Sequence, residues 1–178
     1  MFRAMQRMVR FVGVLNASVW FGALLFFTLG AGPAFFSEAM IRLLTKPYAG
    51  AAAQVIIERL FTLQLVCCVI AWLHLLGEWL YTGRPFPKST AVVLGILLAL
   101  GLFGSNHLQP KLKGLHVQKY SPRSTPAQKE EAAVTFSKWH GISQSANLLV
   151  LGCTLFYLWQ MTMNLPPQRF GSAARVRP

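Results

Sequence analysis

The chain is poor in charge and has no aspartate; its five acidic residues are all glutamate. Charged residues make up 12% of the 178 positions, about half of the share in soluble globular domains. Hydrophobic residues make up 54%, which is far too many for a disordered chain. This composition excludes intrinsic disorder, argues against an ordinary soluble domain and indicates a small polytopic membrane protein.

The sequence also lacks the motifs of the common soluble enzymes. It contains no dinucleotide fingerprint, phosphate-binding loop, zinc-protease motif or serine-hydrolase elbow. Its three cysteines, Cys67, Cys68 and Cys153, lie in apolar segments rather than in loops, so they form no disulfide framework. Adjacent cysteines on a helix point about 100° apart, a poor geometry for a metal site. We therefore expect a protein that is not an enzyme.

Long apolar stretches are what the sequence does have. A bilayer core about 30 Å thick needs about 20 helical residues, and four stretches meet this requirement. They cover residues 11–36, 58–82, 89–108 and 140–163. None shows the strict alternation of a membrane β-barrel. The sequence predicts an all-α, four-transmembrane-helix bundle, with one domain over residues 1–165 and a flexible basic tail over residues 166–178.

The connections between the spans differ in character. Residues 37–46 have the apolar spacing of a short interfacial helix, which Lys46 and Pro47 should end. Residues 82–87 predict a tight turn, so the second and third spans should be antiparallel. Residues 110–125 predict a basic, irregular loop in which His116 is solvated. The segment from Thr125 to Gln128 predicts the start of a helix by a capping box.

The 17 Lys and Arg residues give a formal net charge of +12. Because these residues lie in the loops, we expect them to contact anionic lipids rather than nucleic acid. They divide almost evenly between the two sides of the membrane. The three arginines before the first span, Arg3, Arg7 and Arg10, favour cytoplasmic termini. We expect an integral protein of a bacterial inner membrane.

The second span contains an ionisable pair. His74 and Glu78 are four residues apart and share one helix face. Ionisable groups in a span are costly and should face the bundle interior. The pair could act as a proton relay, as half of a metal site, or as a haem or chlorophyll ligand with its partner. A structural role, with His74 hydrogen-bonded across the bundle, is the alternative that we favour.

A second group of polar residues lies at the other ends of the spans. His140, Gln144 and Asn147 share one face of the fourth span. His107 ends the third span on the same side of the membrane, so His107 and His140 could pair around haem, chlorophyll or copper. The alternative is structural: Asn106 and Asn147 would join helices by hydrogen bonds.

Small residues four apart favour close packing of helices, either inside the bundle or against another protein. The pairs are Gly13 with Ala17, Ser18 with Gly22, and Gly101 with Ser105.

Several short motifs resemble the transmembrane protein 205-like family. They are VWFGALLFF at residues 19–27, which includes Trp20 and Gly22; GPAFF at 32–36; RLF at 59–61; Asn106 with PKL at 110–112; and Phe136 with HGIS at 140–143 and NLL at 147–149. The resemblance covers most of the chain. It implies a four-helix fold and signature positions at Asn106, Pro110, His140, Ser143 and Asn147. The family has no assigned activity and is distantly similar to copper-resistance protein D-like membrane proteins, a wider group that includes haem-binding oxidases of porphyrin synthesis.

These observations lead to three functional hypotheses. The first is a non-catalytic membrane protein, an accessory or structural subunit of a larger complex, in contact with other membrane subunits and lipid. The second is a protein that binds haem, chlorophyll or copper through His74, Glu78, His107 or His140. The third is a small transporter, which a single intramembrane glutamate and the absence of a broken helix pair make the weakest.

Overall fold

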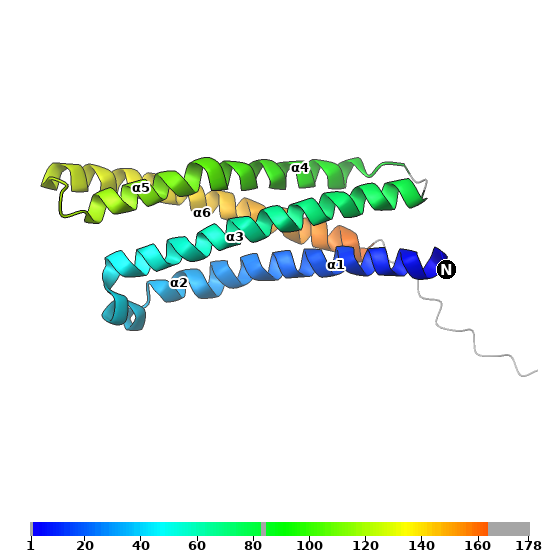
Figure 1. Cartoon of the computed structure of the whole chain (residues 1–178), viewed down its shortest axis with the longest axis horizontal. Helices are drawn as coiled ribbons and strands as arrows, with labels where there is room; N and C mark the ends of the chain where they lie inside the picture. Colours follow the sequence, from blue (N-terminus) through cyan, green and yellow to red (C-terminus); the bar gives the residue numbers. More distant parts are fainter. Residues whose placement is uncertain (1, 83–84, 164–178) are drawn as a thin grey trace, which may run out of the picture.

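The computed structural model describes residues 2–82 and 85–163. Within this part of the chain every regular element is a helix (Figure 1). The elements are α1 (Phe2–Phe26), the π-helical turn η1 (Phe27–Ala31), α2 (Gly32–Phe35), α3 (Glu38–Thr82), α4 (Lys88–Phe103), the π-helical turn η2 (Gly104–Leu108), α5 (Gln109–Tyr120) and α6 (Pro126–Met163). The predicted tail lies outside the described residues.

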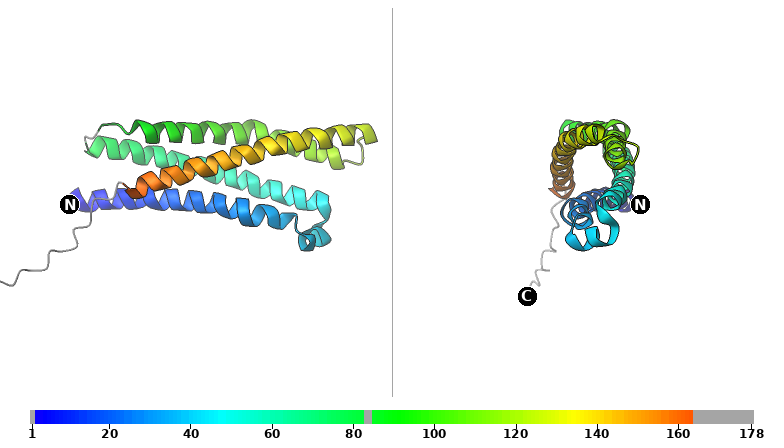
Figure 2. Two further views of the ribbon diagram at one scale, coloured as in Figure 1. Left: turned by 180° about the vertical axis from the view of Figure 1, so that it is seen from behind. Right: turned by 90° about the vertical axis from the view of Figure 1, so that its left-hand side faces the viewer.

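The helices form an antiparallel bundle of four rods: α1 with α2, α3, α4 with α5, and α6. Each rod packs against two neighbours, in the order α1, α3, α4, α6 and back to α1. Viewed along its axis, the bundle shows the rods arranged around a central space (Figure 2). Four helical segments of the described chain are long and apolar enough to cross a membrane. The all-α polytopic fold predicted from the sequence is confirmed.

The core fills the half of the bundle that is nearer to the start of α1. Trp20 on α1 and Tyr157 on α6 are each 1% exposed, and their rings meet edge to face at 6.4 Å. Asn16 is buried beside them and donates a hydrogen bond from Nδ2 to the backbone oxygen of Cys67, at 2.9 Å. The core therefore joins α1, α3 and α6 by ring packing and by a buried interhelical hydrogen bond.

The long helix α3 is kinked near its start. Thr45 has φ 57° and ψ 160°, which separates a short helix over residues 38–44 from the span that follows. The short helix predicted after the first span is therefore present. It ends at Thr45 rather than at Lys46, and the next helix contains Pro47 at its start, where a proline nitrogen would have no hydrogen-bond partner in any case.

The segment predicted as an irregular loop is a helix for most of its length. Gln109–Tyr120 forms α5, which continues from η2 with Pro110 in its first turn. Proline is tolerated there because the preceding π-helical turn departs from the regular hydrogen-bond ladder, so a residue without an N–H can be accommodated. His116 is half-buried rather than solvated, and its Nε2 lies 3.0 Å from the backbone oxygen of Pro47.

The fourth rod, α6, extends far beyond the membrane span expected for it. Its 38 residues make a rod about 57 Å long, against a bilayer core of about 30 Å. Its first turns pack on α5, and this hairpin projects past α2 and the kink of α3 (Figure 1). The predicted capping box begins the helix: the backbone nitrogen of Thr125 donates to Gln128 Oε1 at 2.9 Å, and that of Gln128 donates to Thr125 Oγ1 at 3.3 Å.

Candidate ligand-binding cavity

A cavity of about 580 Å³ lies between all four rods, in the half of the bundle farther from the start of α1. Its size is within the range of small-molecule sites, about 300–1,000 Å³. The residues that line it are Leu24, Phe27, Thr28, Gly32, Pro33, Phe36, Ala53, Ile57, Leu60, Phe61, Gln64, Leu100, Phe103, Gly104, Leu108, His140, Ser143, Gln144, Ala146, Asn147, Leu148 and Val150. Most are apolar, so the cavity suits a mainly apolar molecule.

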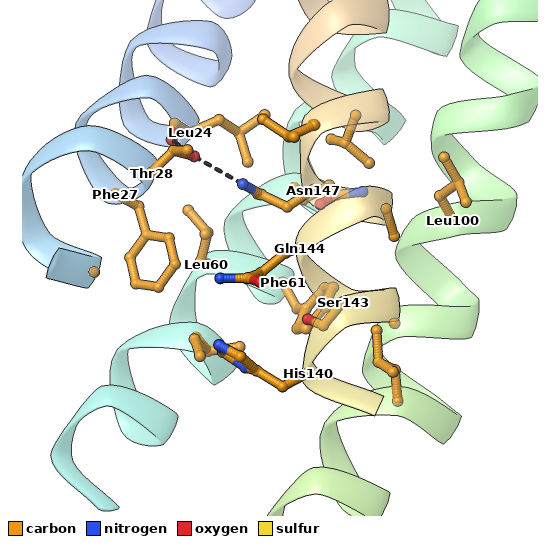
Figure 3. Close-up of a pocket in the computed structure, with 18 of the residues that line it drawn as sticks. Leu24, Phe27, Thr28, Leu60, Phe61, Leu100, His140, Ser143, Gln144 and Asn147 are labelled. Carbon is orange, nitrogen blue, oxygen red and sulfur yellow. Dashed lines mark hydrogen bonds between the residues drawn. The ribbon is translucent and has the colours of Figure 1, made fainter. Parts of the chain in front are cut away.

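Polar groups reach the cavity along one face of α6. His140, Ser143, Gln144 and Asn147 follow one another at spacings of three, one and three residues, which aligns them on one side of a helix. All four line the cavity, and the His140 ring and Gln144 amide are directed to the same side of α6 (Figure 3). We call these four residues the polar strip.

Asn147, the last residue of the polar strip, joins α6 to the first rod by a hydrogen bond. Its Nδ2 donates to Thr28 Oγ1 at 2.8 Å, and the Thr28 hydroxyl donates to the backbone oxygen of Leu24 at 2.7 Å (Figure 3). Interhelical hydrogen bonds in membranes contribute about 0.6–2 kcal/mol. The bond predicted for Asn147 is confirmed, and it fixes the register of α1 against α6 beside the cavity.

The apolar walls include four phenylalanines, Phe27, Phe36, Phe61 and Phe103. Phe61 on α3 is seated against Gly104 of η2, where an added Cβ would come within 2.2 Å of the ring. A side chain larger than hydrogen at position 104 would have to displace the Phe61 ring. Glycine at this position therefore sets the position of one aromatic wall.

Both π-helical turns border the cavity, η1 through Phe27 and Thr28 and η2 through Gly104 and Leu108. A π-helical turn departs from the regular hydrogen-bond ladder and occurs frequently at functional sites. Here the two turns lie on different spans and meet at the same cavity. The presence of both turns at the cavity supports the interpretation that it is a binding site and not merely a packing defect.

The polar atoms of the cavity carry no full charge. The described residues that line it include no Lys, Arg, Asp or Glu. Its polar side chains are Thr28, Gln64 and the polar strip, and Gln64 already donates through Nε2 to the backbone oxygen of Leu97 at 3.3 Å. The site therefore offers hydrogen bonds without an electrostatic partner for a charged group.

The residues predicted from the sequence divide between the cavity and other places. His140, Ser143 and Asn147 line the cavity, whereas Asn106 and His107 are exposed on η2 and are not among its lining residues. The ring of His107 contacts Phe103 at 5.8 Å, while the ring of His140 stacks on Phe136 at 5.6 Å. The pairing of His107 with His140 around a cofactor stays a prediction.

Asn106 does not join helices as predicted, because its exposed side chain forms no hydrogen bond with another described residue. Pro110 is also exposed, in the first turn of α5. Trp20 lies in the core rather than at the cavity. Gly22 faces outward, and an added Cβ there would meet nothing within 4 Å.

His74 and Glu78 lie on α3 away from the cavity. The His74 ring is 7% exposed and sits against Gly13 of α1, where an added Cβ would come within 2.5 Å of Nε2. Neither ring nitrogen forms a hydrogen bond of good geometry with the described residues, and a weaker one joins the ring to the backbone of Val9. Glu78 is half-buried and close enough to act electrostatically on His74.

Metal binding has little support in this arrangement. The described residues contain no group of three or more His, Cys, Asp or Glu side chains that could hold a metal ion. A copper site built from His107 and His140 would need further ligands at that place. A haem or chlorophyll in the cavity would find one imidazole, that of His140.

Comparison with known proteins gives a family. A family model described as a domain of unknown function (DUF4149) matches residues 15–121, more than half of the chain. The chain belongs to this family. No curated protein and no solved structure matches it. The DUF4149 match includes Trp20, His74 and Asn106 but ends before α6, so the polar strip lies outside it.

Sequence reasoning identified the polar face of α6 but not the walls opposite it. Phe27 and Phe61 belong to the motifs at residues 19–27 and 59–61, but the motifs do not show which of their side chains face inward, and Gln64 lies in an apolar span. The glycines opposite their side chains were the available signal: Gly104 faces Phe61, and Gly101 faces Gln64. Reading that signal requires knowing how α3 and α4 are paired.

Proposed function

We propose that this DUF4149 protein is a non-catalytic integral membrane protein that holds a small, mainly apolar molecule between its four spans. The observation that carries the proposal is the cavity of about 580 Å³, with apolar walls from all four rods and a polar strip on α6. Apolar pockets with a few convergent polar groups are the usual form of small-molecule sites.

The test is to fill the cavity. Ala146 lines it, whereas its neighbour Ser145 is exposed and does not. The protein, purified gently from its membrane, is extracted and analysed by mass spectrometry for a co-purifying small molecule. We expect near-stoichiometric recovery with the native protein and with Ser145→Trp, and loss with Ala146→Trp. Equal recovery from both variants, or no molecule in any preparation, would contradict the proposal.

Haem or chlorophyll held by His140 is one form of this proposal. Either pigment would give the purified protein a visible absorption band, and His140→Leu would shift or remove that band. A colourless preparation that still contains an extractable molecule would exclude both pigments. Copper is tested on the same samples by metal analysis before and after His140→Leu.

We also propose that the protein associates with other membrane subunits as an accessory component. Ser18 and Gly22 form an outward-facing small-residue pair on α1, and the space around Gly22 is open. Such pairs let a second helix approach closely. Gly22→Leu should leave the monomer folded but shift its native size after solubilisation. Migration as a lone chain before and after the change would disprove association through this face.

The DUF4149 match covers residues 15–121. We propose kinship with the transmembrane protein 205-like proteins, because the motifs at Trp20, Asn106, Pro110 and His140 extend beyond the matched segment into α6. We propose a bacterial inner membrane as the location, with cytoplasmic termini and anionic lipids at the basic loops.

A further inference from the structure

The cavity is open to the surface of the bundle. Its lining includes exposed apolar side chains: Phe36, which follows α2, is 53% exposed, Phe103 on α4 is 43% exposed and Leu148 on α6 is 60% exposed. Leu148 lies well inside the fourth span, so its exposed surface contacts lipid rather than water. A ligand can therefore reach the cavity from the bilayer, which selects molecules that dissolve in lipid.

The ligand that this site selects is uncharged. No described lining residue carries a charge, and a charged group left unpaired in a membrane interior is strongly disfavoured. A phospholipid headgroup or an ionised fatty acid would find no partner in the cavity. Neutral, lipid-soluble molecules are therefore the class of ligand that suits the cavity.

The polar strip has free hydrogen-bonding capacity at its outer end. His140, Ser143 and Gln144 form no side-chain hydrogen bond with the described residues, unlike Asn147, which is held by Thr28. Imidazole, hydroxyl and amide groups all donate hydrogen bonds. His140 and Gln144 are four residues apart on α6, a rise of about 6 Å. Two donors on successive turns of one helix can reach two acceptor oxygens of one ring.

The walls beside these donors are aromatic. The side chains of Phe27 and Phe61 lie across from the Gln144 amide and the His140 ring (Figure 3). Phenylalanine faces and edges pack well against a flat ring. The apolar residues farther in, such as Leu24, Leu100 and Val150, can surround an alkyl or isoprenoid chain.

We infer that the cavity binds a neutral, lipid-soluble molecule with a flat ring that carries two carbonyl oxygens, the chemistry of a quinone. It enters from the bilayer, and its carbonyls accept hydrogen bonds from His140 and Gln144. The inference rests on the proposed function and names the ligand class of that same site. It concerns binding only.

The test uses the full chain in nanodiscs of phosphatidylcholine, with decylubiquinone as the probe. Binding to the folded state adds RT ln(1 + c/Kd) to its stability, where c is the free ligand concentration, so Tm rises with the concentration of the ligand and Kd follows from the dependence. We expect this concentration-dependent rise in Tm for the native protein. Gln144→Leu and His140→Leu should each raise the apparent Kd about three- to tenfold, the loss of one hydrogen bond. Ser145→Leu, a neighbouring exposed position outside the cavity, should leave Kd unchanged.

Two further probes separate this inference from the proposed function. Decanol is neutral but has no ring, and decanoate is charged; both carry a chain like that of the probe. Concentration-dependent stabilisation by decylubiquinone alone, weakened by Gln144→Leu and His140→Leu, supports the inference. Equal stabilisation by decanol would overturn the quinone inference and leave the cavity as a ligand site. If no probe stabilises the protein while Ala146→Trp still expels an extracted molecule, the inference fails and the proposed function stands.

Discussion

At the scale of single residues, three glycines leave the space that rings from neighbouring helices occupy. An added Cβ would come within 2.5 Å of the His74 ring at Gly13, within 2.2 Å of the Phe61 ring at Gly104 and within 2.4 Å of the His116 ring at Gly50. In each case a ring from one helix is in close contact with the backbone of another helix. Large rings can then be packed without separating the rods, which is how membrane helices gain van der Waals contact.

Gly13→Ala should destabilise the protein by about 1–3 kcal/mol, the usual range for overpacking a well-packed site. The measurement is equilibrium unfolding in mixed micelles. Gly22→Ala is the matched control on the same helix, because the space around Gly22 is open; it should be neutral or mildly stabilising through helix propensity. Combining Gly13→Ala with His74→Ala should recover part of the loss. Equal effects of both glycine substitutions on the free energy of unfolding would refute the close contact between the His74 ring and Gly13.

Some residues of the site could be predicted from the sequence and others could not. Spacing alone placed His140, Gln144 and Asn147 on one face, because α6 is a regular helix over this stretch. The proposed approach of His107 to His140 depended on the direction of His107, which lies in η2. A π-helical turn changes the direction of the side chains within it, and no sequence signal announced one here.

At the scale of elements, the kink in α3 stores strain at one residue. Thr45 has φ 57° and ψ 160°, a region that glycine adopts almost exclusively. Thr45→Gly should therefore stabilise the protein by about 1 kcal/mol or more, measured by the same unfolding experiment. The control Thr62→Gly lies in the regular part of α3 and should destabilise by about 1 kcal/mol. Destabilisation by Thr45→Gly would mean that the threonine side chain makes a contact that outweighs the strain.

The sequence predicted helix breaks better than helix continuation. Lys46 and Pro47 correctly marked a break to within two residues, because proline restricts the residue before it. The same logic failed at Pro110 and Gly114, since the π-helical turn η2 accommodates the proline that follows it and α5 has a long partner in α6. Tertiary packing on α6 outweighs the weak intrinsic helix preference of this segment.

At the scale of the whole molecule, the topology gives a sharp prediction. The projecting α5–α6 hairpin lies at the opposite end of the bundle from the start of α1 and the end of α6 (Figure 1). With cytoplasmic termini, the exposed Gln118 of α5 is on the outer side, so Gln118→Cys should react with a membrane-impermeant maleimide in intact cells. The native cysteines lie in the spans and are buried or half-buried, which keeps the background low. A cysteine tag at the C-terminus should react only after permeabilisation; the reverse pattern would invert the topology.

Three of the four rods are interrupted near the cavity end, α1 by η1, α3 by the Thr45 kink and α4 by η2, whereas α6 runs from Pro126 to Met163 as one helix. The rods that supply most of the apolar wall are thus the ones with local departures from regular helix, where bending is least costly. The rod that supplies the polar strip keeps its repeat. Tolerance and selectivity are therefore divided between elements: the cavity can adjust its shape to chains of different length while the spacing of its hydrogen-bonding groups stays constant.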